Sequence, residues 1–175
     1  MAAIAHVSIG LASKRAVPNV PLWVLIACTC LLDVLYFILF FLGIEISDNP
    51  FWSHSLLMAV IWSALASLIA ESINHDGRTS LFIGLLVFSH WIVDFITWPT
   101  GVPLFPFEGS GWISLGLFNP IYNSQIGIII GIVVVEFGSL IFGIGIYFLT
   151  WKRLKREKEL ATRNQTVNPQ FVLRV

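Results

Sequence analysis

The sequence predicts an all-α integral membrane protein with four transmembrane helices and a short N-terminal helix that is re-entrant or interfacial. Hydrophobic residues make up 57% of the 175 residues, whereas charged residues make up only 11%. This balance is typical of chains in contact with lipid and not of soluble domains. The few charges are also unevenly placed along the chain, and their placement indicates how the helices are oriented.

The predicted spans are apolar stretches long enough to cross a hydrocarbon core of roughly 30 Å at about 1.5 Å per helical residue. They cover residues 21–43, 54–73, 79–97 and 125–149. The connection over residues 98–124 is rich in glycine, proline and aromatic residues, and we expect it to cover the outer ends of the helices. Residues 1–151 are therefore predicted to form one transmembrane domain, followed by a basic cytoplasmic tail over residues 152–175.

The apolar stretch that ends at Ser13 is too short to span the membrane. No basic residue precedes it, so a cleaved signal peptide fits poorly. A short helix that dips into the membrane or lies on its surface is the remaining interpretation.

All 10 Lys and Arg residues fall on one side of the predicted bundle. They are Lys14, Arg15, Arg78 and the basic residues of the tail. The two outer connections contain acidic residues instead, namely Glu45, Asp48 and Glu108. The positive-inside rule therefore predicts that the N- and C-termini are both cytoplasmic.

Ionisable side chains within the apolar spans indicate where a functional site lies. An acid at the bilayer centre costs about 2.5–3.5 kcal/mol on insertion scales, so it needs a partner, a proton or a polar cavity. His90 and Asp94 are four residues apart and project from one face of their helix. A divalent cation bound by this pair is one interpretation, and the mixed nitrogen and oxygen donors suit zinc, iron or manganese. A hydrogen bond between the two side chains is the other.

Helix depth predicts further donors near this pair. His54 begins the second span at the outer surface and can approach Asp94, while Asp33 lies near the level of His90. His6 joins them if the N-terminal helix dips into the membrane, and otherwise lies at a disordered end. The predicted metal ligands are His6, Asp33, His54, His90 and Asp94.

Glu136 is the remaining acid within a span, and we expect it to lie deeper in the membrane. It is a candidate hydrogen-bond partner for a ligating histidine or a candidate general base. The alternative is a protonated carboxyl group bonded to a neighbouring helix.

These residues give the chain a resemblance to the YdjM-like family of bacterial inner-membrane proteins, described as membrane-bound metal-dependent hydrolases. The most specific element is Ser-His-x-x-x-Asp-x-x-Thr over residues 89–97, followed by Gly-Val-Pro-Leu-Phe-Pro-Phe over residues 101–107. The small residues after His6, the Leu-Asp pair ending at Asp33 and the His-Ser pair starting at His54 match as well. The resemblance covers roughly residues 5 to 147.

The resemblance implies a metal-dependent hydrolase of the bacterial cytoplasmic membrane. In such an enzyme we expect zinc as the metal and Asp33 and Glu136 as the catalytic carboxylates. The His-x-x-x-Asp block is also similar to that of zinc-dependent phospholipase C, which implies phosphoester hydrolysis. The chain departs from the family pattern in two places. Residues 32–35 read Leu-Asp-Val-Leu where the family has Pro-Asp-x-Asp, and residues 50–53 read Pro-Phe-Trp-Ser where it has Arg-Gly-x-Thr.

A non-catalytic multi-pass protein is the competing interpretation, with a polar cluster that is structural, binds metal without turnover or passes protons. The sequence contains neither a Gly-rich phosphate loop nor a basic patch interleaved with aromatic residues, so no nucleotide or nucleic-acid partner is expected. The expected partners are the lipid bilayer and a lipid or lipid-linked substrate that reaches the site in the outer half of the membrane.

Overall fold

The computed structural model describes residues 3–46, 49–98, 100–116 and 132–167. The start of the predicted fourth span, the end of the predicted outer connection and the end of the tail (residues 117–131 and 168–175) lie outside the described residues. The elements are α1 (Ala3–Ser13), α2 (Leu22–Thr29), α3 (Leu31–Phe41), α4 (Phe51–His54), α5 (Leu56–Asn74), α6 (Gly77–Thr97), β1 (Val102–Pro103), β2 (Trp112–Ile113), the π-helix η1 (Ile132–Phe137) and α9 (Gly138–Val167).

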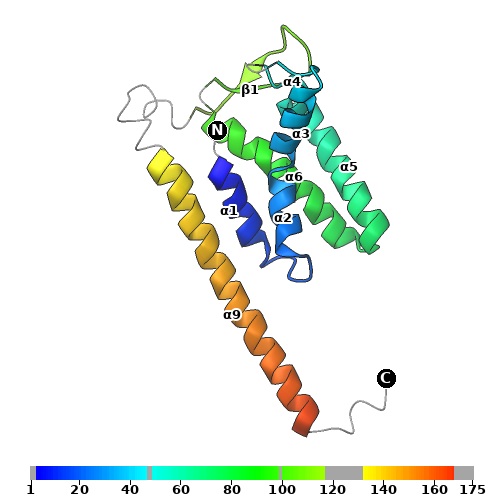
Figure 1. Ribbon diagram of the computed structural model, residues 1–175, viewed down its shortest axis with the longest axis vertical. Helices are drawn as coiled ribbons and strands as arrows, with labels where there is room; N and C mark the ends of the chain where they lie inside the picture. Colours follow the sequence, from blue (N-terminus) through cyan, green and yellow to red (C-terminus); the bar gives the residue numbers. More distant parts are fainter. Residues whose placement is uncertain (1–2, 47–48, 99, 117–131, 168–175) are drawn as a thin grey trace.

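The predicted all-α membrane fold is confirmed. Three helical segments are long and apolar enough to cross a membrane, namely α5, α6 and the segment Val134–Arg163. The pair α2 and α3 passes the same test as one bent span, so the described part of the chain holds three spans, or four with that pair. Figure 1 shows α2, α3, α5 and α6 running between the same two ends of the bundle, whereas α9 extends well beyond the end away from the hairpin.

Helix α6 is the centre of the bundle, because α1, α2, α3 and α5 all contact it. Its buried positions recur along its whole length, from Ser80 to Asp94. Helix α5 approaches it closely at Gly84, where an added Cβ would lie 2.8 Å from the carbonyl oxygen of Ser63. At every depth of the bundle, some side chains of α6 therefore face the interior.

The prediction of one continuous helix over residues 21–43 is wrong, since the chain bends by 58° between α2 and α3. The Thr29 hydroxyl lies 2.9 Å from the Ile26 carbonyl oxygen and 3.4 Å from the Leu25 carbonyl oxygen four residues back, and a hydroxyl bond to the latter often bends a helix. In an unbroken helix the Thr29 carbonyl would accept the N–H of the residue four positions later. Here it accepts a hydrogen bond from His90 of α6 instead.

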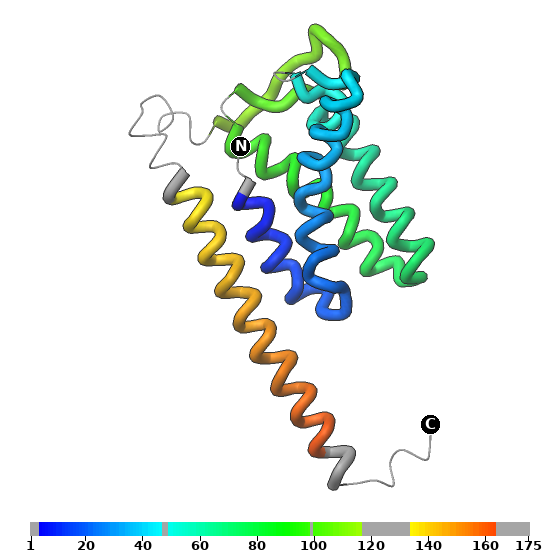
Figure 2. Tube along the Cα trace, viewed as in Figure 1, coloured from blue at the N-terminus to red at the C-terminus, as the bar shows by residue number. Residues whose placement is uncertain are grey.

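The short helix α1 packs against α2, α6 and α9 inside the bundle, as the trace in Figure 2 shows, and so fits the re-entrant alternative better than the interfacial one. Its 11 residues give a length of about 16 Å, roughly half of a hydrocarbon core. Glycines allow close approach on both sides of α1. A Cβ added at Gly10 would lie 2.9 Å from the Ile26 Cα, and a Cβ added at Gly143 would lie 2.6 Å from the Ser8 carbonyl oxygen.

Helix α9 continues to Val167, beyond the end of the predicted fourth span at residue 149. Charge pairs one turn apart follow the apolar part, with 2.8 Å between Arg153 and Glu157 and 4.0 Å between Lys155 and Glu159. Such pairs support an exposed helix where lipid contact ends. The helix passes without interruption through the expected domain boundary at residue 151, and the division into a domain and a tail stays a prediction.

A short β-hairpin lies over the end of the bundle where α3 ends and α5 begins (Figure 1). Strand β1 is buried, and Leu104 after it accepts a hydrogen bond from the Leu57 N–H at 3.2 Å. Gly101 has a φ of 87°, and an added Cβ there would lie 2.7 Å from the Ile113 carbonyl oxygen, so only glycine fits. The described part of the predicted outer connection thus covers the helix ends as expected.

We expect Gly143→Ala to destabilise the protein by about 1–3 kcal/mol, because the new methyl group meets the backbone of Ser8 and pushes α1 away from α9. Gly145→Ala is the matched control, since a Cβ added at Gly145 would meet no atom of a neighbouring segment within 4 Å. Thermal unfolding in detergent measures both. Equal melting temperatures for the two variants would contradict the close contact between α1 and α9.

Candidate metal centre

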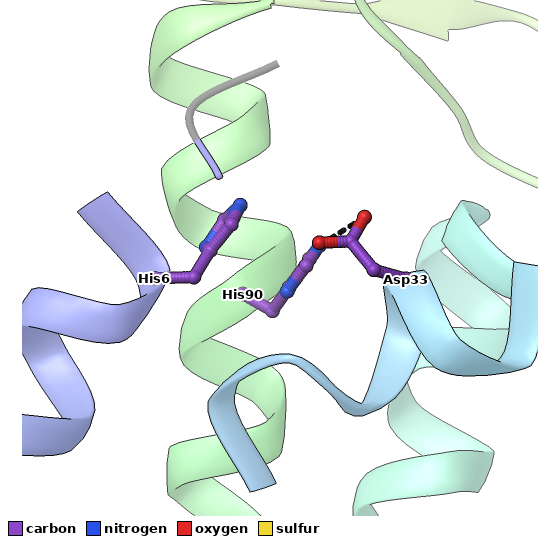
Figure 3. Close-up of side chains that lie close together, drawn as sticks. All are labelled: His6, Asp33 and His90. Carbon is purple, nitrogen blue, oxygen red and sulfur yellow. Dashed lines mark ion pairs between the residues drawn. The ribbon is translucent and has the colours of Figure 1, made fainter. Parts of the chain in front are cut away.

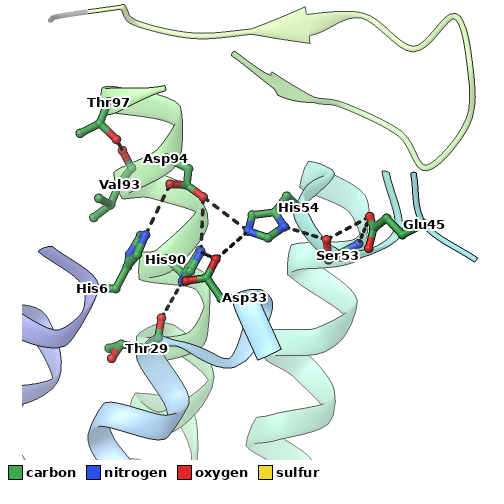
Figure 4. Close-up of polar contacts among 10 residues, drawn as sticks. All are labelled: His6, Thr29, Asp33, Glu45, Ser53, His54, His90, Val93, Asp94 and Thr97. Atoms are coloured by element: carbon green, nitrogen blue, oxygen red, sulfur yellow. Dashed lines mark hydrogen bonds and ion pairs between the residues drawn. The ribbon is translucent and has the colours of Figure 1, made fainter. Parts of the chain in front are cut away.

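All five predicted ligands converge at one depth of the bundle, on the side nearer the hairpin (Figure 4). Helix α1 contributes His6, α3 contributes Asp33, the last residue of α4 is His54, and α6 contributes His90 and Asp94. They form two overlapping sets whose donor atoms lie within 4.8 Å of one another. One set is His54, His90 and Asp94, and the other is His6, Asp33 and His90, which Figure 3 shows in detail.

Two histidine nitrogens and two carboxylate oxygens face one another across a small space. The Nε2 atom of His54 lies 3.5 Å from Asp33 Oδ1 and 3.6 Å from Asp94 Oδ2. The Nε2 atom of His90 lies 3.6 Å from Asp33 Oδ1 and 3.3 Å from Asp94 Oδ2. A tetrahedral site with metal–ligand distances of about 2.0–2.2 Å has edges of about 3.3–3.6 Å between its donor atoms. These four nitrogen-to-oxygen separations match the edges of such a site.

Burial leaves the two histidine nitrogens without another partner. The side chains of His54 and His90 are 2% and 0% exposed, and neither Nε2 atom has a hydrogen-bond partner. Among the described residues, the ion pairs of Asp33 and Asp94 involve histidines only. Two carboxylates without a Lys or Arg partner are costly in an apolar interior, and a cation would balance them.

His90 is held in the tautomer that a metal ligand requires. Its Nδ1 lies 2.6 Å from the carbonyl oxygen of Thr29, which can only accept a hydrogen bond. Nδ1 therefore carries a proton, and in the neutral ring the lone pair of Nε2 is free to bind a cation. The break between α2 and α3 makes this carbonyl available.

His54 has a side-chain partner at the corresponding nitrogen. Its Nδ1 lies 2.7 Å from the Ser53 hydroxyl oxygen, and that hydroxyl donates to Glu45 Oε1 at 3.0 Å. The ring also makes edge contacts with Tyr36 and Trp98. These contacts fix the orientation of the imidazole from three sides.

The family profile described as YdjM inner membrane protein matches residues 1–161, a stretch that includes all five donors. The chain belongs to the YdjM inner membrane protein family. No curated protein and no solved structure matches this chain. The similarity of its His-x-x-x-Asp block to phospholipase C stays a prediction.

His6 of this YdjM-family chain contacts the second oxygen of Asp94, with 3.4 Å between Nε2 and Oδ1. Its ring stacks on that of His90, with 3.6 Å between the centroids and 7° between the planes. A cation in the plane of the His90 ring cannot also lie in the plane of the His6 ring, where the lone pairs of His6 point. The stacked geometry therefore favours a role for His6 in orienting Asp94.

Glu136 lies in the π-helix η1, away from the two donor sets. Its Oε2 atom accepts hydrogen bonds from the N–H groups of Ile4 and Ala5 at 2.9 and 3.1 Å. These N–H groups belong to the first turn of α1, which has no partner for them within the helix. Glu136 thus caps the helix that carries His6.

Three groups at the centre were missed by sequence reasoning: the Glu45 carboxylate, the Ser53 hydroxyl and the Thr29 carbonyl. Glu45 was expected only to mark an outer connection. Its place in the apolar stretch before the histidine-bearing segment was the available signal. Thr97, which continues the face of His90 and Asp94, donates its hydroxyl to the Val93 carbonyl at 2.8 Å and makes no other hydrogen bond among the described residues.

We expect His6→Ala to lower zinc affinity by about 10–100-fold, because Asp94 loses the group that orients it. His6→Gln should lose less, since its amide N–H can still donate to Asp94. His75→Ala is the matched control, because His75 is exposed in the connection between α5 and α6. Competition with a chromophoric chelator measures the affinities. Complete loss of zinc in both His6 variants would instead identify His6 as a direct ligand.

Proposed function

We propose that this protein is a membrane-bound metal-dependent hydrolase whose cation is held by Asp33, His54, His90 and Asp94. The observation that carries the proposal is the set of four nitrogen-to-oxygen separations of 3.3–3.6 Å between buried groups. The two imidazole nitrogens have no hydrogen-bond partner, and the two carboxylates have no Lys or Arg partner among the described residues. Together they form a donor set that suits zinc.

When bound with one coordination position left to water, such a cation would activate that water molecule and would polarise an oxygen of the scissile group. Asp33 is the most accessible of the four side chains, with 27% of its surface exposed against at most 4% for the others. Only its Oδ1 atom faces the histidines. In this proposal the other oxygen of Asp33 accepts the proton of the attacking water.

The surroundings of Asp33 favour a substrate that arrives through the membrane. Val34 and Phe37 on the same helix are exposed apolar side chains, and the hairpin covers the nearby end of the bundle. A substrate that reaches the carboxylate from this side must have a hydrocarbon part. We therefore propose a phosphoester or ester that is part of a lipid or linked to one.

The placement of basic residues supports an orientation with the centre in the outer half of the membrane. The connection with Lys14 and Arg15 and the connection before Arg78 lie at the end of the bundle away from the hairpin (Figure 1). The charged part of α9 extends from the same end. By the positive-inside rule this end is cytoplasmic.

Glu136 has a positioning role in this proposal. It fixes the first turn of α1 by two hydrogen bonds, and that turn places His6 beside Asp94. A general-base role would need contact with water at the cation, and the carboxylate oxygen is instead used at the main chain of Ile4 and Ala5.

We expect detergent-purified protein to contain about one zinc, iron or manganese per chain, because the donor set is complete without an added ligand. The double variant His90→Ala, Asp94→Ala should lose it. His75→Ala, Glu108→Ala is the control, since it also removes one histidine and one acid, both exposed. Elemental mass spectrometry, on protein purified without chelator, measures the content. Absence of metal from the wild type would leave a structural or proton-handling cluster as the explanation.

We expect the metal-loaded protein to cleave a phosphoester or ester of a membrane lipid, and Asp33→Asn to lower the rate by at least about 100-fold through loss of the proton acceptor. Mass spectrometry of vesicles that contain phospholipids and lipid-linked phosphates detects the products. If the wild type holds metal yet leaves every lipid unchanged, the hydrolase proposal fails and a non-catalytic metal protein remains.

A further inference from the structure

We infer that Glu45 and Ser53 form a positioning relay that sets the tautomer of His54 and thereby the metal affinity of the centre. The inference rests on the proposed function, because it concerns the same site. It assigns a role to two residues outside the predicted ligand set, from the connection after α3 and from the short helix α4.

Glu45 is a buried acid with a well-defined set of partners. It is only 4% exposed and lies at the end of the bundle that the hairpin covers. Its Oε1 atom accepts hydrogen bonds from the Trp52 N–H at 3.0 Å, the Ser53 N–H at 3.1 Å and the Ser53 hydroxyl at 3.0 Å. An acid that served only to keep an outer connection in water would be exposed, as Glu108 is.

The direction of the hydrogen bonds follows from the chemistry of the three groups. The single hydroxyl proton of Ser53 is donated to Glu45, so Ser53 Oγ can only accept at its other contact. That contact is His54 Nδ1 at 2.7 Å, which must therefore carry the ring proton. Nε2 then has a lone pair, and this is the atom that faces Asp33 Oδ1 and Asp94 Oδ2.

The relay differs from the anchor of the other histidine. His90 is fixed by the carbonyl of Thr29, which no substitution of the Thr29 side chain removes. His54 depends on two side chains, and the second of them is a carboxylate whose Oε2 atom is buried without a hydrogen-bond partner. A carboxylate behind a ligating histidine raises the basicity of the ligand and holds its ring in place. His54 is therefore the proposed ligand whose basicity depends on neighbouring side chains.

Helix capping is the alternative role for Glu45, because two of its partners are the N–H groups of Trp52 and Ser53 in the first turn of α4. Ser53→Ala separates the two roles. It removes the hydroxyl of the relay and leaves both N–H groups bonded to Glu45. Ser53→Thr keeps a hydroxyl at the same position and should restore the relay.

The experiment measures Co²⁺ affinity, the visible absorption of bound Co²⁺ and the melting temperature of the metal-free protein. We expect Ser53→Ala and Glu45→Gln to lower the affinity by about 10–100-fold and to change the Co²⁺ spectrum. The double variant should bind Co²⁺ no more weakly than the weaker-binding single variant, because both substitutions break the same relay. Ser53→Thr should bind like the wild type, as should the control Glu108→Gln. The metal-free melting temperature of Ser53→Ala should stay within a few degrees of that of the wild type.

Three results would overturn the relay. The first is a Co²⁺ affinity of Ser53→Ala equal to that of the wild type, and the second is additive losses of affinity in the double variant. The third is a loss of affinity in Ser53→Ala that is accompanied by a correspondingly lower metal-free melting temperature. They are distinguishable from a failure of the proposed function. If the wild type itself binds no Co²⁺, the metal site is wrong. If the wild type binds Co²⁺ and Ser53→Ala does so equally well, only the relay is wrong.

Discussion

The structure depends on two carboxylates, Asp33 and Asp94, that lie within an apolar bundle and pair only with histidines among the described residues. Neutral imidazoles cannot balance two negative charges, whereas a divalent cation can. The same cation would use the lone pairs of His54 and His90, which have no other partner. One divalent cation would thus balance both acids and use both nitrogens, and this favours a metal centre over a hydrogen-bonded cluster.

The helices are interrupted where these donors meet. Helices α2 and α3 are separated at Cys30, α4 and α5 at Ser55, and α1 is too short to span. Breaks within a membrane are tolerated only where the freed polar groups find partners in the protein. The Thr29 carbonyl bonds to His90, and the Ser55 hydroxyl accepts from the Met58 N–H at 3.4 Å. The irregular backbone is therefore part of the construction of the centre.

The sequence predicted the fold class and the convergence of the five donor side chains, because both follow from local patterns. Four-residue spacing places His90 and Asp94 on one face, and counting residues along a span places His54 and Asp33 at their depth. The break at Cys30 and the burial of Glu45 were not predictable in this way. Each depends on a contact between distant segments, such as the one from His90 to Thr29 over 61 positions. A main-chain acceptor also leaves no side-chain pattern in the sequence.

Helix α1 links η1 and α9 to the centre. Glu136 on η1 holds the first turn of α1, and Gly143 lets α9 approach Ser8 closely enough to keep the two helices in contact. His6 then reaches Asp94 on the side away from His54. The π-helix turn is significant here, because such turns shift the register of side chains on a helix and often lie at functional sites. Glu136 lies outside the donor sets, and its connection to them runs through α1, whose first turn it bonds and whose His6 contacts Asp94.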